Sequence, residues 1–315
     1  MATPITRLAV TGSSGFIGTR LCGRAAALGI DVLPVSIRPE SPSYGALERH
    51  SPHDPPQALV HLAARVHVMN ESAADPLTAY RRVNLDGTLA LARTAAQIGV
   101  GRFVFVSSVK VNGESTLPGQ QFGPEPCEPP DDPYGRSKWE AERALRELAA
   151  RTGMEVVIVR PPLVYGPGVR ANFQSLVSAV RRGLPLPLAL ATRNRRSLVG
   201  VDNLVDLLLT CATHPAAAGQ TFMASDGEDM STAELLRRIG LAMGRPARLW
   251  SMPLSLLQLG ATLVGRGGMA QRLLDNLQVD IRHTRNTLNW TPPLSVDEGL
   301  RRAVQPELHD PQAPV

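Results

Sequence analysis

Short apolar runs alternate with longer amphipathic stretches along the first half of the chain. The short runs predict strands, and the longer stretches, in which apolar residues recur every three or four positions, predict helices. The predicted strands are Ile5–Thr11, Asp31–Ile37, Ala58–Ala63, Arg102–Ser108 and Glu155–Arg160. Strands that alternate with helices pair in parallel, so the pattern predicts a doubly wound α/β sheet with helices on both of its faces.

Glycines and prolines divide this half into its elements. Three helices are each followed closely by a glycine, which readily ends a helix; they span Gly15–Leu28, Asp75–Ile98 and Tyr134–Arg151. Residues 38–57 lack clear periodicity and predict mostly loop, with at most a short helix near Tyr44–Arg49. Gly113–Pro133 is a second proline-rich connection, and long loops beside a rigid sheet often carry function.

The second half follows a less regular pattern. Its predicted helices are separated by glycine and proline turns, and they span Phe173–Arg182, Val201–Thr213, Thr232–Met243 and Ala270–Val279. We expect a first domain over residues 1–165, a smaller α/β lobe with substrate contacts over residues 166–305, and a polar tail over residues 306–315. Some strands and helices are expected to cross between the two lobes.

Composition excludes several classes of protein. The 315 residues are 43% hydrophobic and 19% charged, which is typical of an ordinary globular protein. The net charge of +5 is not concentrated in a basic stripe with aromatics, so we expect no nucleic-acid partner, and it suits an anionic small molecule. Leu254–Val264 is apolar but too short to span a bilayer. We expect it to pack on the second lobe, with a role at a membrane surface as the alternative.

The cysteines and the N-terminus indicate a cellular location. Cys22, Cys127 and Cys211 are far apart and odd in number, which favours a reducing compartment without disulfides and without a metal site. The first residues show no signal-peptide pattern. We therefore expect a cytoplasmic protein.

A glycine-rich turn follows the first predicted strand. Residues 11–18 read Thr-Gly-Ser-Ser-Gly-Phe-Ile-Gly. The three glycines permit a tight turn, a close backbone approach to a diphosphate, and close packing of helix on strand. The N-terminus of the following helix offers free N–H groups and a positive dipole end. The turn therefore predicts a dinucleotide site.

A second group of residues has side chains that are suited to proton transfer. Tyr134 and Lys138 stand four residues apart at the start of a helix, so their side chains share one face. A nearby ammonium is expected to lower the pKa of the phenol from about 10, so that it exchanges a proton with a reacting oxygen. Ser107 and Ser108 end the fourth strand, at the sheet edge where ligands bind, and a serine hydroxyl there can bond the same oxygen.

Together these motifs resemble the extended short-chain dehydrogenases/reductases, in the group of sugar-nucleotide 4-epimerases and 4-ketoreductases. The resemblance covers roughly residues 5–303, and it implies a Rossmann-type fold that binds NAD(P). The segments that carry it are Thr11–Gly18, His61–Ala64, Asn84–Thr88, Ser107–Ser108, Tyr134–Lys138, Arg160–Gly168 and Arg196–Leu204.

The resemblance implies a role for individual residues. Ser108, Tyr134 and Lys138 would form the catalytic triad, with Tyr134 and Lys138 also holding the cofactor. The other implied cofactor contacts are Gly12, Ser14, Gly15, Phe16, Ile17, Gly18, Leu62, Ala63, Ala64, Asn84, Ser107 and Pro161. The implied substrate contacts are Ser108, Val109, Lys110, Asn172 and Arg196. Structural readings stay open for three of these: an internal hydrogen bond for Asn84, a helix cap for Asn172 and a surface charge for Arg196.

Two departures from the family pattern narrow the reaction. The 4,6-dehydratases of the family carry an Asp-Glu pair where this chain has Val109 and Lys110, which cannot do the same acid–base work. NAD-selective members carry an acidic residue after the second strand, where this chain has Ser36-Ile37-Arg38. Arg38 could pair with a 2′-phosphate, so NADP(H) is favoured over NAD(H), unless Arg38 is only an exposed loop cation.

The resemblance therefore predicts an enzyme that acts at C4 of a UDP-sugar. The first expectation is NADPH-dependent reduction of a UDP-4-keto-6-deoxy-N-acetylhexosamine, of the kind found in O-antigen pathways. The alternatives are a UDP-glucose or UDP-N-acetylglucosamine 4-epimerase and a non-catalytic NAD(P)-binding regulator. A homodimer is expected to form through Asp75–Ile98 and Tyr134–Arg151, whose alanines permit close helix packing.

Overall fold

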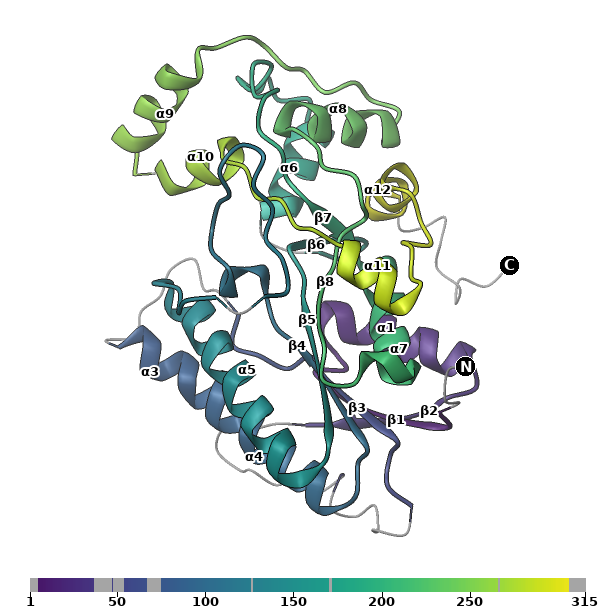
Figure 1. The fold of residues 1–315 in the computed structure, drawn as a ribbon. Coiled ribbons are helices and arrows are strands. Elements are labelled where there is room, and N and C mark those ends of the chain that lie inside the picture. Colours follow the sequence, from purple (N-terminus) through teal and green to yellow (C-terminus); the bar gives the residue numbers. More distant parts are fainter. Residues whose placement is uncertain are drawn as a thin grey trace.

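The chain folds around a parallel sheet. The computed structural model describes residues 5–36, 47, 54–66, 75–125, 127–169, 172–265 and 267–305. Among these residues a six-stranded sheet has the order β2-β1-β3-β4-β5-β8, with every pair parallel (Figure 1). The strands are Arg7–Thr11 (β1), Asp31–Val35 (β2), Ala58–His61 (β3), Arg102–Val106 (β4), Glu155–Arg160 (β5) and Thr221–Met223 (β8). The predicted Rossmann-type sheet is confirmed, and β8 is a strand that the sequence pattern did not predict.

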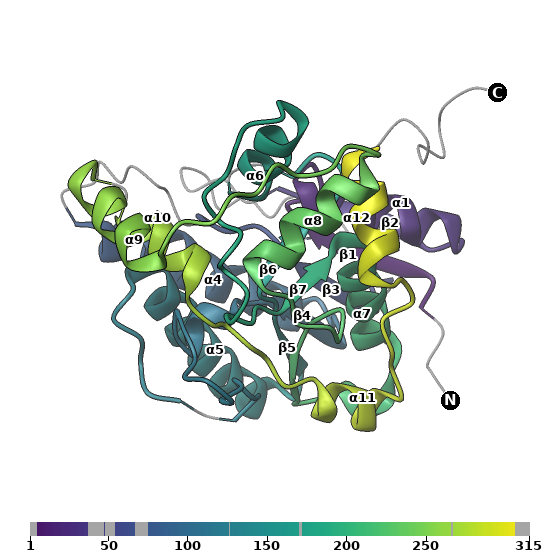
Figure 2. The same cartoon turned by 90° about the horizontal axis from the view of Figure 1, so that it is seen from above.

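Helices cover both faces of this sheet (Figures 1 and 2). One face carries α1 (Phe16–Ala27) and α7 (Val201–Thr213). The other face carries α4 (Thr88–Gln97) and α5 (Pro133–Thr152), with α3 (Pro76–Arg81) beside them. Two buried cores therefore sandwich the sheet.

The strand sequences fit this double burial. In β4, Val104 and Val106 pack in the core under α1 and α7, whereas Phe103 and Phe105 pack in the core under α4 and α5. Successive strand residues point to opposite faces, so a strand buried on both sides is apolar throughout rather than alternating. This explains why the strands appear in the sequence as short unbroken apolar runs.

A smaller lobe lies beyond the carboxyl ends of the strands (Figure 1). It contains the parallel pair β6 (Leu163–Tyr165) and β7 (Leu198–Gly200). Its helices are α6 (Asn172–Arg181), α8 (Thr232–Ala242), α9 (Leu254–Leu263), α10 (Gly267–Leu274) and α12 (Val296–Val304). The chain returns to the large sheet for β8 and for α11 (Arg282–Leu288), which packs beside it. None of the described helices combines the length and apolarity needed to cross a bilayer.

Two predicted helices differ from the structure. The segment Asp75–Ile98 is interrupted by a π-helix over Arg82–Gly87, between α3 and α4. The prediction of a helix over Ala270–Val279 is wrong in its second half, because α10 ends at Leu274 and the next residues are extended. There the alternate residues Leu277 and Val279 are buried and form single bridges to other segments. Contacts with distant segments thus hold the residues after Leu274 in an extended course, where the sequence predicted the end of a helix.

Two further expectations are not decided by the fold. The predicted short helix near Tyr44–Arg49 and the candidate Arg38 lie outside the described residues, apart from Leu47, which is helical and buried. Of the alanines expected at a dimer interface, Ala92, Ala95 and Ala141 are fully buried in the core of their own chain. The homodimer stays a prediction.

Candidate active site

The glycine-rich turn lies where the strand order reverses, between β1 and β3. In doubly wound sheets ligands bind at this point, beyond the carboxyl ends of the strands. Gly12 has a φ of 66°, and a Cβ added to it would lie 3.0 Å from the amide nitrogen of Ala63 after β3. Position 12 therefore needs glycine both for its backbone conformation and for the close meeting of the two turns.

The turn leads into a helix without a side-chain cap. Gly15 is the N-cap residue of α1, and it has no side chain that could bond the N–H groups of the first turn. A Cβ on Gly18 would lie only 2.1 Å from the carbonyl oxygen of Gly12, so helix and turn are in tight contact. Bare backbone at a helix N-terminus fits a diphosphate, and the cofactor contacts of Gly12, Gly15 and Gly18 stay predictions. Ser14 is exposed beside them, and Phe16 and Ile17 are half-buried.

A buried threonine joins the two turns. The Thr11 hydroxyl accepts hydrogen bonds from the amides of Leu62 and Ala63, both at 3.1 Å. It also bonds Nδ1 of His61 at 2.7 Å, and Nε2 of the same ring bonds the Thr88 hydroxyl at 2.9 Å. Burial, aided by the Lys138 charge, lowers the pKa of His61 to about 3. This histidine stays neutral and fixes the half-buried Leu62–Ala64 segment, where the cofactor contacts are predicted.

The predicted catalytic side chains converge from β4 and α5. Ser108 follows β4, Tyr134 lies in the first turn of α5, and a hydrogen bond with Ser108 lowers the pKa of the Tyr134 phenol. Gly135 makes this approach possible, because a Cβ there would lie 2.6 Å from the carbonyl oxygen of Lys110. The Tyr134 ring packs edge-on against buried Tyr80 at 5.8 Å. Serine and tyrosine thus meet as the sequence predicted.

The pKa of the phenol corrects one expectation. Burial is the largest effect and raises the pKa of Tyr134 to about 12, with further increases from Asp132 and Tyr80. Lys138 has no part in this shift, so the expected lowering by the lysine is wrong for the protein alone. The physical reason is that removal from water disfavours the phenolate more than the Ser108 hydrogen bond favours it. Tyr134 is therefore a neutral proton donor at neutral pH.

The Lys138 side chain is buried at the carboxyl end of β4. Its ammonium donates to the carbonyl oxygen of Val106 at 2.9 Å and lies 4.5 Å from the ring centre of Phe105. Burial lowers its pKa to about 7, while Glu142, one turn further along α5, opposes the shift. Lys138 is therefore poised to change its charge near neutral pH.

Asn84 links the site to the π-helix. Its Nδ2 donates to the carbonyl oxygen of Arg65 and to the Ser137 hydroxyl, both at 3.0 Å, and its Oδ1 accepts from the Arg65 amide at 2.9 Å. Ser137 in turn donates to the carbonyl oxygen of Tyr134 at 2.8 Å. The fully buried asparagine therefore links the segment after β3 to the helix that carries Tyr134. These contacts cross between elements, unlike the internal helix bond considered from the sequence.

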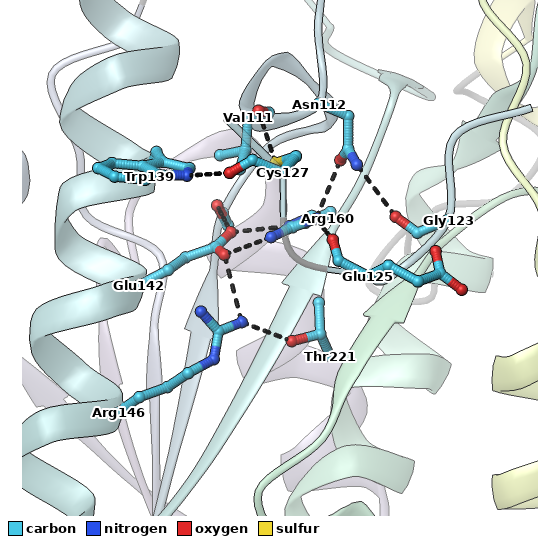
Figure 3. A network of polar contacts seen from close by, with 11 residues as sticks. Val111, Asn112, Gly123, Glu125, Cys127, Trp139, Glu142, Arg146, Arg160 and Thr221 are labelled. Atoms are coloured by element: carbon cyan, nitrogen blue, oxygen red, sulfur yellow. Dashed lines mark hydrogen bonds and ion pairs between the residues drawn. The ribbon is translucent and has the colours of Figure 1, made fainter. Parts of the chain in front are cut away.

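A buried ion pair joins the same helix to the sheet (Figure 3). Glu142 on α5 accepts from Nε and Nη2 of Arg160 on β5, at 2.9 and 2.6 Å. It also accepts from the hydroxyl of Ser107 at 2.6 Å and from Nη2 of Arg146 at 3.5 Å. The Arg160 guanidinium reaches Asn112 as well, at 3.2 Å.

Sequence reasoning gave this pair no role. The only signal was the position of Glu142, one helical turn after Lys138. The structure also shows that the Ser107 hydroxyl donates to Glu142 and that its backbone amide donates to the carbonyl oxygen of Val159 at 2.8 Å, so neither donor stays available for the predicted cofactor contact. Pro161, the last of the predicted cofactor contacts, is buried, and its carbonyl oxygen accepts from the Val109 amide at 2.9 Å.

The predicted substrate contacts differ in their burial and in their charged neighbours. Val109 is 4% exposed and belongs to a buried cluster. The Lys110 ammonium lies 2.6 Å from Glu114 and 3.3 Å from Asp132, so two carboxylates already neutralise it. Neither residue can replace the acidic pair of a dehydratase, in agreement with the sequence argument.

Arg196 lies in the smaller lobe and is half-buried. Its Nη1 donates to the carbonyl oxygen of Asp275 at 3.1 Å, and no ion pair with a carboxylate forms within the described part of the chain. Burial lowers the pKa of Arg196, the nearby Asp275 carboxylate opposes this shift, and Arg272 lowers the pKa further. A guanidinium that forms no ion pair with a described carboxylate suits an anionic ligand. Asn172 begins α6, and its side chain is outside the described part.

Comparisons with known proteins agree with this geometry. Residues 8–224 match the model of the NAD dependent epimerase/dehydratase family. The chain is 44% identical over 307 residues to a UDP-glucose 4-epimerase of Vibrio cholerae, which covers 94% of each chain. Similar solved structures include the UDP-glucose 4-epimerase of Thermotoga maritima with UDP-glucose, at 21% identity and a TM-score of 0.73 over 95% and 97% of the two chains. Another is RMD of Pseudomonas aeruginosa complexed with NADPH, at 22% identity and a TM-score of 0.74 over 95% and 98%.

The family match spans the glycine-rich turn, the serine after β4, the Tyr134–Lys138 helix and β8. The V. cholerae relative extends the likeness over the smaller lobe. The chain is therefore an enzyme of the NAD dependent epimerase/dehydratase family, within the extended short-chain dehydrogenases/reductases.

Proposed function

We propose that the protein transfers a hydride between NAD(P) and C4 of a UDP-linked hexose. The observation that carries this proposal is the hydrogen bond between Ser108 and Tyr134, at the same edge of the sheet as buried Lys138 and the uncapped glycine turn that begins α1. A phenol, a hydroxyl and an ammonium at one sheet edge are the groups needed to move a proton at a sugar oxygen. A bound NAD(P) would supply the hydride acceptor or donor.

The other steps, which are proton transfer, cofactor binding and substrate binding, would fall to different residues. Tyr134, with its raised pKa, would give its proton to the C4 oxygen in the reductive direction, while Ser108 would hold that oxygen by a hydrogen bond. Gly12, Gly15 and Gly18 would leave room for the cofactor diphosphate at the start of α1. Arg196, with Arg272 close by, would bind the diphosphate of the UDP moiety.

Two reactions are compatible with these proposed roles, and each is favoured by one observation. Reduction of a UDP-4-keto-6-deoxy-N-acetylhexosamine is favoured by the end of β2, where Ser36 stands in place of a carboxylate that would repel the 2′-phosphate of NADPH. A 4-epimerase of UDP-glucose or UDP-N-acetylglucosamine is favoured by the 44% identical relative, which bears that name. The reductase consumes its cofactor in each turnover, whereas the epimerase recycles it.

One experiment tests the proposal and separates the two reactions. The protein is incubated with NADPH or NADH and a panel of UDP-sugars that includes 4-keto forms, and the products are identified by NMR. NADPH consumed in equal amount to a 4-keto sugar supports the reductase. Interconversion of UDP-glucose and UDP-galactose without net redox change supports the epimerase. If no sugar is altered at C4 while cofactor binds, the proposal is refuted.

A further inference from the structure

Helix α9 exposes an apolar face that the active site does not use. Leu256, Leu259 and Leu263 are 57%, 58% and 79% exposed, and Val264, which follows them, is 70% exposed. The three leucines recur at intervals of three and four residues, so they lie on one side of the helix. No residue of α9 is fully buried.

The opposite side of α9 attaches it to the lobe. Leu254 and Leu257 are partly buried and pack against the core of the smaller lobe, and α9 also contacts α10. Both views show these two helices at one extremity of the molecule, away from α1 (Figures 1 and 2). The helix is thus anchored by one face, and its second apolar face has no partner within the described chain.

The net charge of the smaller lobe indicates which kind of partner binds the exposed apolar face of α9. Residues 167–201 carry six arginines and residues 239–274 carry four, and neither segment contains an aspartate, a glutamate or a lysine. Since the whole chain has a net charge of only +5, all its other residues together are net negative. The positive charge is therefore concentrated in the lobe that holds α9, where Arg245, Arg248 and Arg272 are exposed.

An exposed apolar helix face on a lobe rich in arginine fits an anionic lipid surface. A helix of this kind inserts its apolar side among the acyl chains while basic residues meet the lipid headgroups. A second copy of this surface would bring like charges together, which disfavours self-association. A nucleic acid would meet the arginines but gain nothing from the leucines.

We propose that α9 is a membrane-docking element that binds the smaller lobe reversibly to an anionic bilayer. Leu256, Leu259, Leu263 and Val264 enter the interface, together with Trp250, which is 45% exposed just before α9. Docking keeps the substrate end of the enzyme at the bilayer, because α10 connects α9 to Asp275, whose carbonyl oxygen holds Arg196.

Vesicle flotation tests this proposal. The full chain is mixed with vesicles of phosphatidylcholine alone or of phosphatidylcholine and phosphatidylglycerol in equal amounts. We expect binding to the anionic vesicles only, weakened by high salt. The Leu259→Glu, Leu263→Glu double variant should bind roughly a hundredfold more weakly, from the loss of two buried leucines. Leu28→Glu, a change at a residue 53% exposed at the end of α1, is the matched control and should bind like the wild type.

Fluorescence adds a local measurement. The chain has three tryptophans, and of these only Trp250 is exposed. We expect anionic vesicles to shift its emission to the blue, and Trp250→Phe to remove the shift while flotation persists.

The proposal is overturned if anionic vesicles do not bind the wild type, or if the double variant binds as well as the control. It is equally overturned if the double variant only changes the oligomeric state. The assay contains no sugar nucleotide, so its failure would leave the proposed function untouched.

Discussion

Replacing Glu142 by glutamine tests the buried ion pair below the active site. The carboxylate is 1% exposed, and the Arg160 side chain that it neutralises is 2% exposed. Glutamine keeps the size and one acceptor oxygen of glutamate but loses the charge, and its NH₂ group would face the N–H groups of the guanidinium. Arg160 would keep only weaker partners, such as Asn112 at 3.2 Å and the carbonyl oxygen of Glu125 at 3.5 Å.

The expected loss of stability is large because the remaining charge stays buried. Removing one partner of a buried ion pair costs about 3–5 kcal/mol of unfolding free energy. This compares with a total of roughly 5–15 kcal/mol for a folded domain, so Glu142→Gln should bring the protein close to unfolding at elevated temperature. Activity should fall as well, since Ser107, which donates to Glu142, precedes Ser108, for which we propose a catalytic role, and since Glu142 raises the pKa of Lys138.

The assay is guanidinium-induced unfolding followed by circular dichroism. Glu114→Gln is the control, because Glu114 also lies 2.6 Å from a cation, the ammonium of Lys110, but is 62% exposed. That change should cost no more than about 1 kcal/mol. Glu142→Met combined with Arg160→Leu should recover most of the lost stability, since an apolar pair needs no charge compensation. If Glu142→Gln costs no more than the control, or if the double variant is as unstable as the single one, the reasoning is wrong.

Three further predictions concern the catalytic helix. Tyr134→Phe should lower kcat by at least about 10²-fold with cofactor affinity nearly unchanged, as measured by steady-state kinetics and NAD(P)H titration; substantial remaining turnover would contradict the proton-transfer role. Gly135→Ala should also lower kcat, because its Cβ would lie 2.6 Å from the carbonyl oxygen of Lys110 and push Tyr134 away from Ser108; normal turnover with an unshifted melting temperature would count against this. Lys138→Met should change how stability depends on pH. The pKa of Lys138 is about 7 in the folded protein, against an ordinary value of 10.5 for lysine. Between these values the unfolded chain binds more protons, so wild-type stability rises with pH. The rise is at most about 1.4 kcal/mol per pH unit, and urea unfolding at about pH 6 and about pH 9 should show it in the wild type but not in the variant; parallel behaviour would refute a buried, titrating lysine.

Local sequence patterns were enough to predict five of the six strands of the large sheet and the helices that cover it. Apolar runs such as Arg102–Val106 identify strands buried on both faces, and the glycines after helices mark their ends, because both signals are local. The candidate site could be predicted for the same reason. Gly12, Ser108 and Tyr134 each lie at or next to the end of a predicted element, and the carboxyl ends of parallel strands must lie at one edge of the sheet.

The tertiary structure alone decided what depends on contacts between distant segments. The partnership of Glu142 with Arg160, the extended course of Leu277 and Val279, and the link from Asn84 to Ser137 all join residues from different elements. The raised pKa of Tyr134 belongs here too, because it comes from burial, which spacing within a helix does not reveal. Local pattern fixes which element forms, whereas packing fixes how much water and which charges each side chain meets.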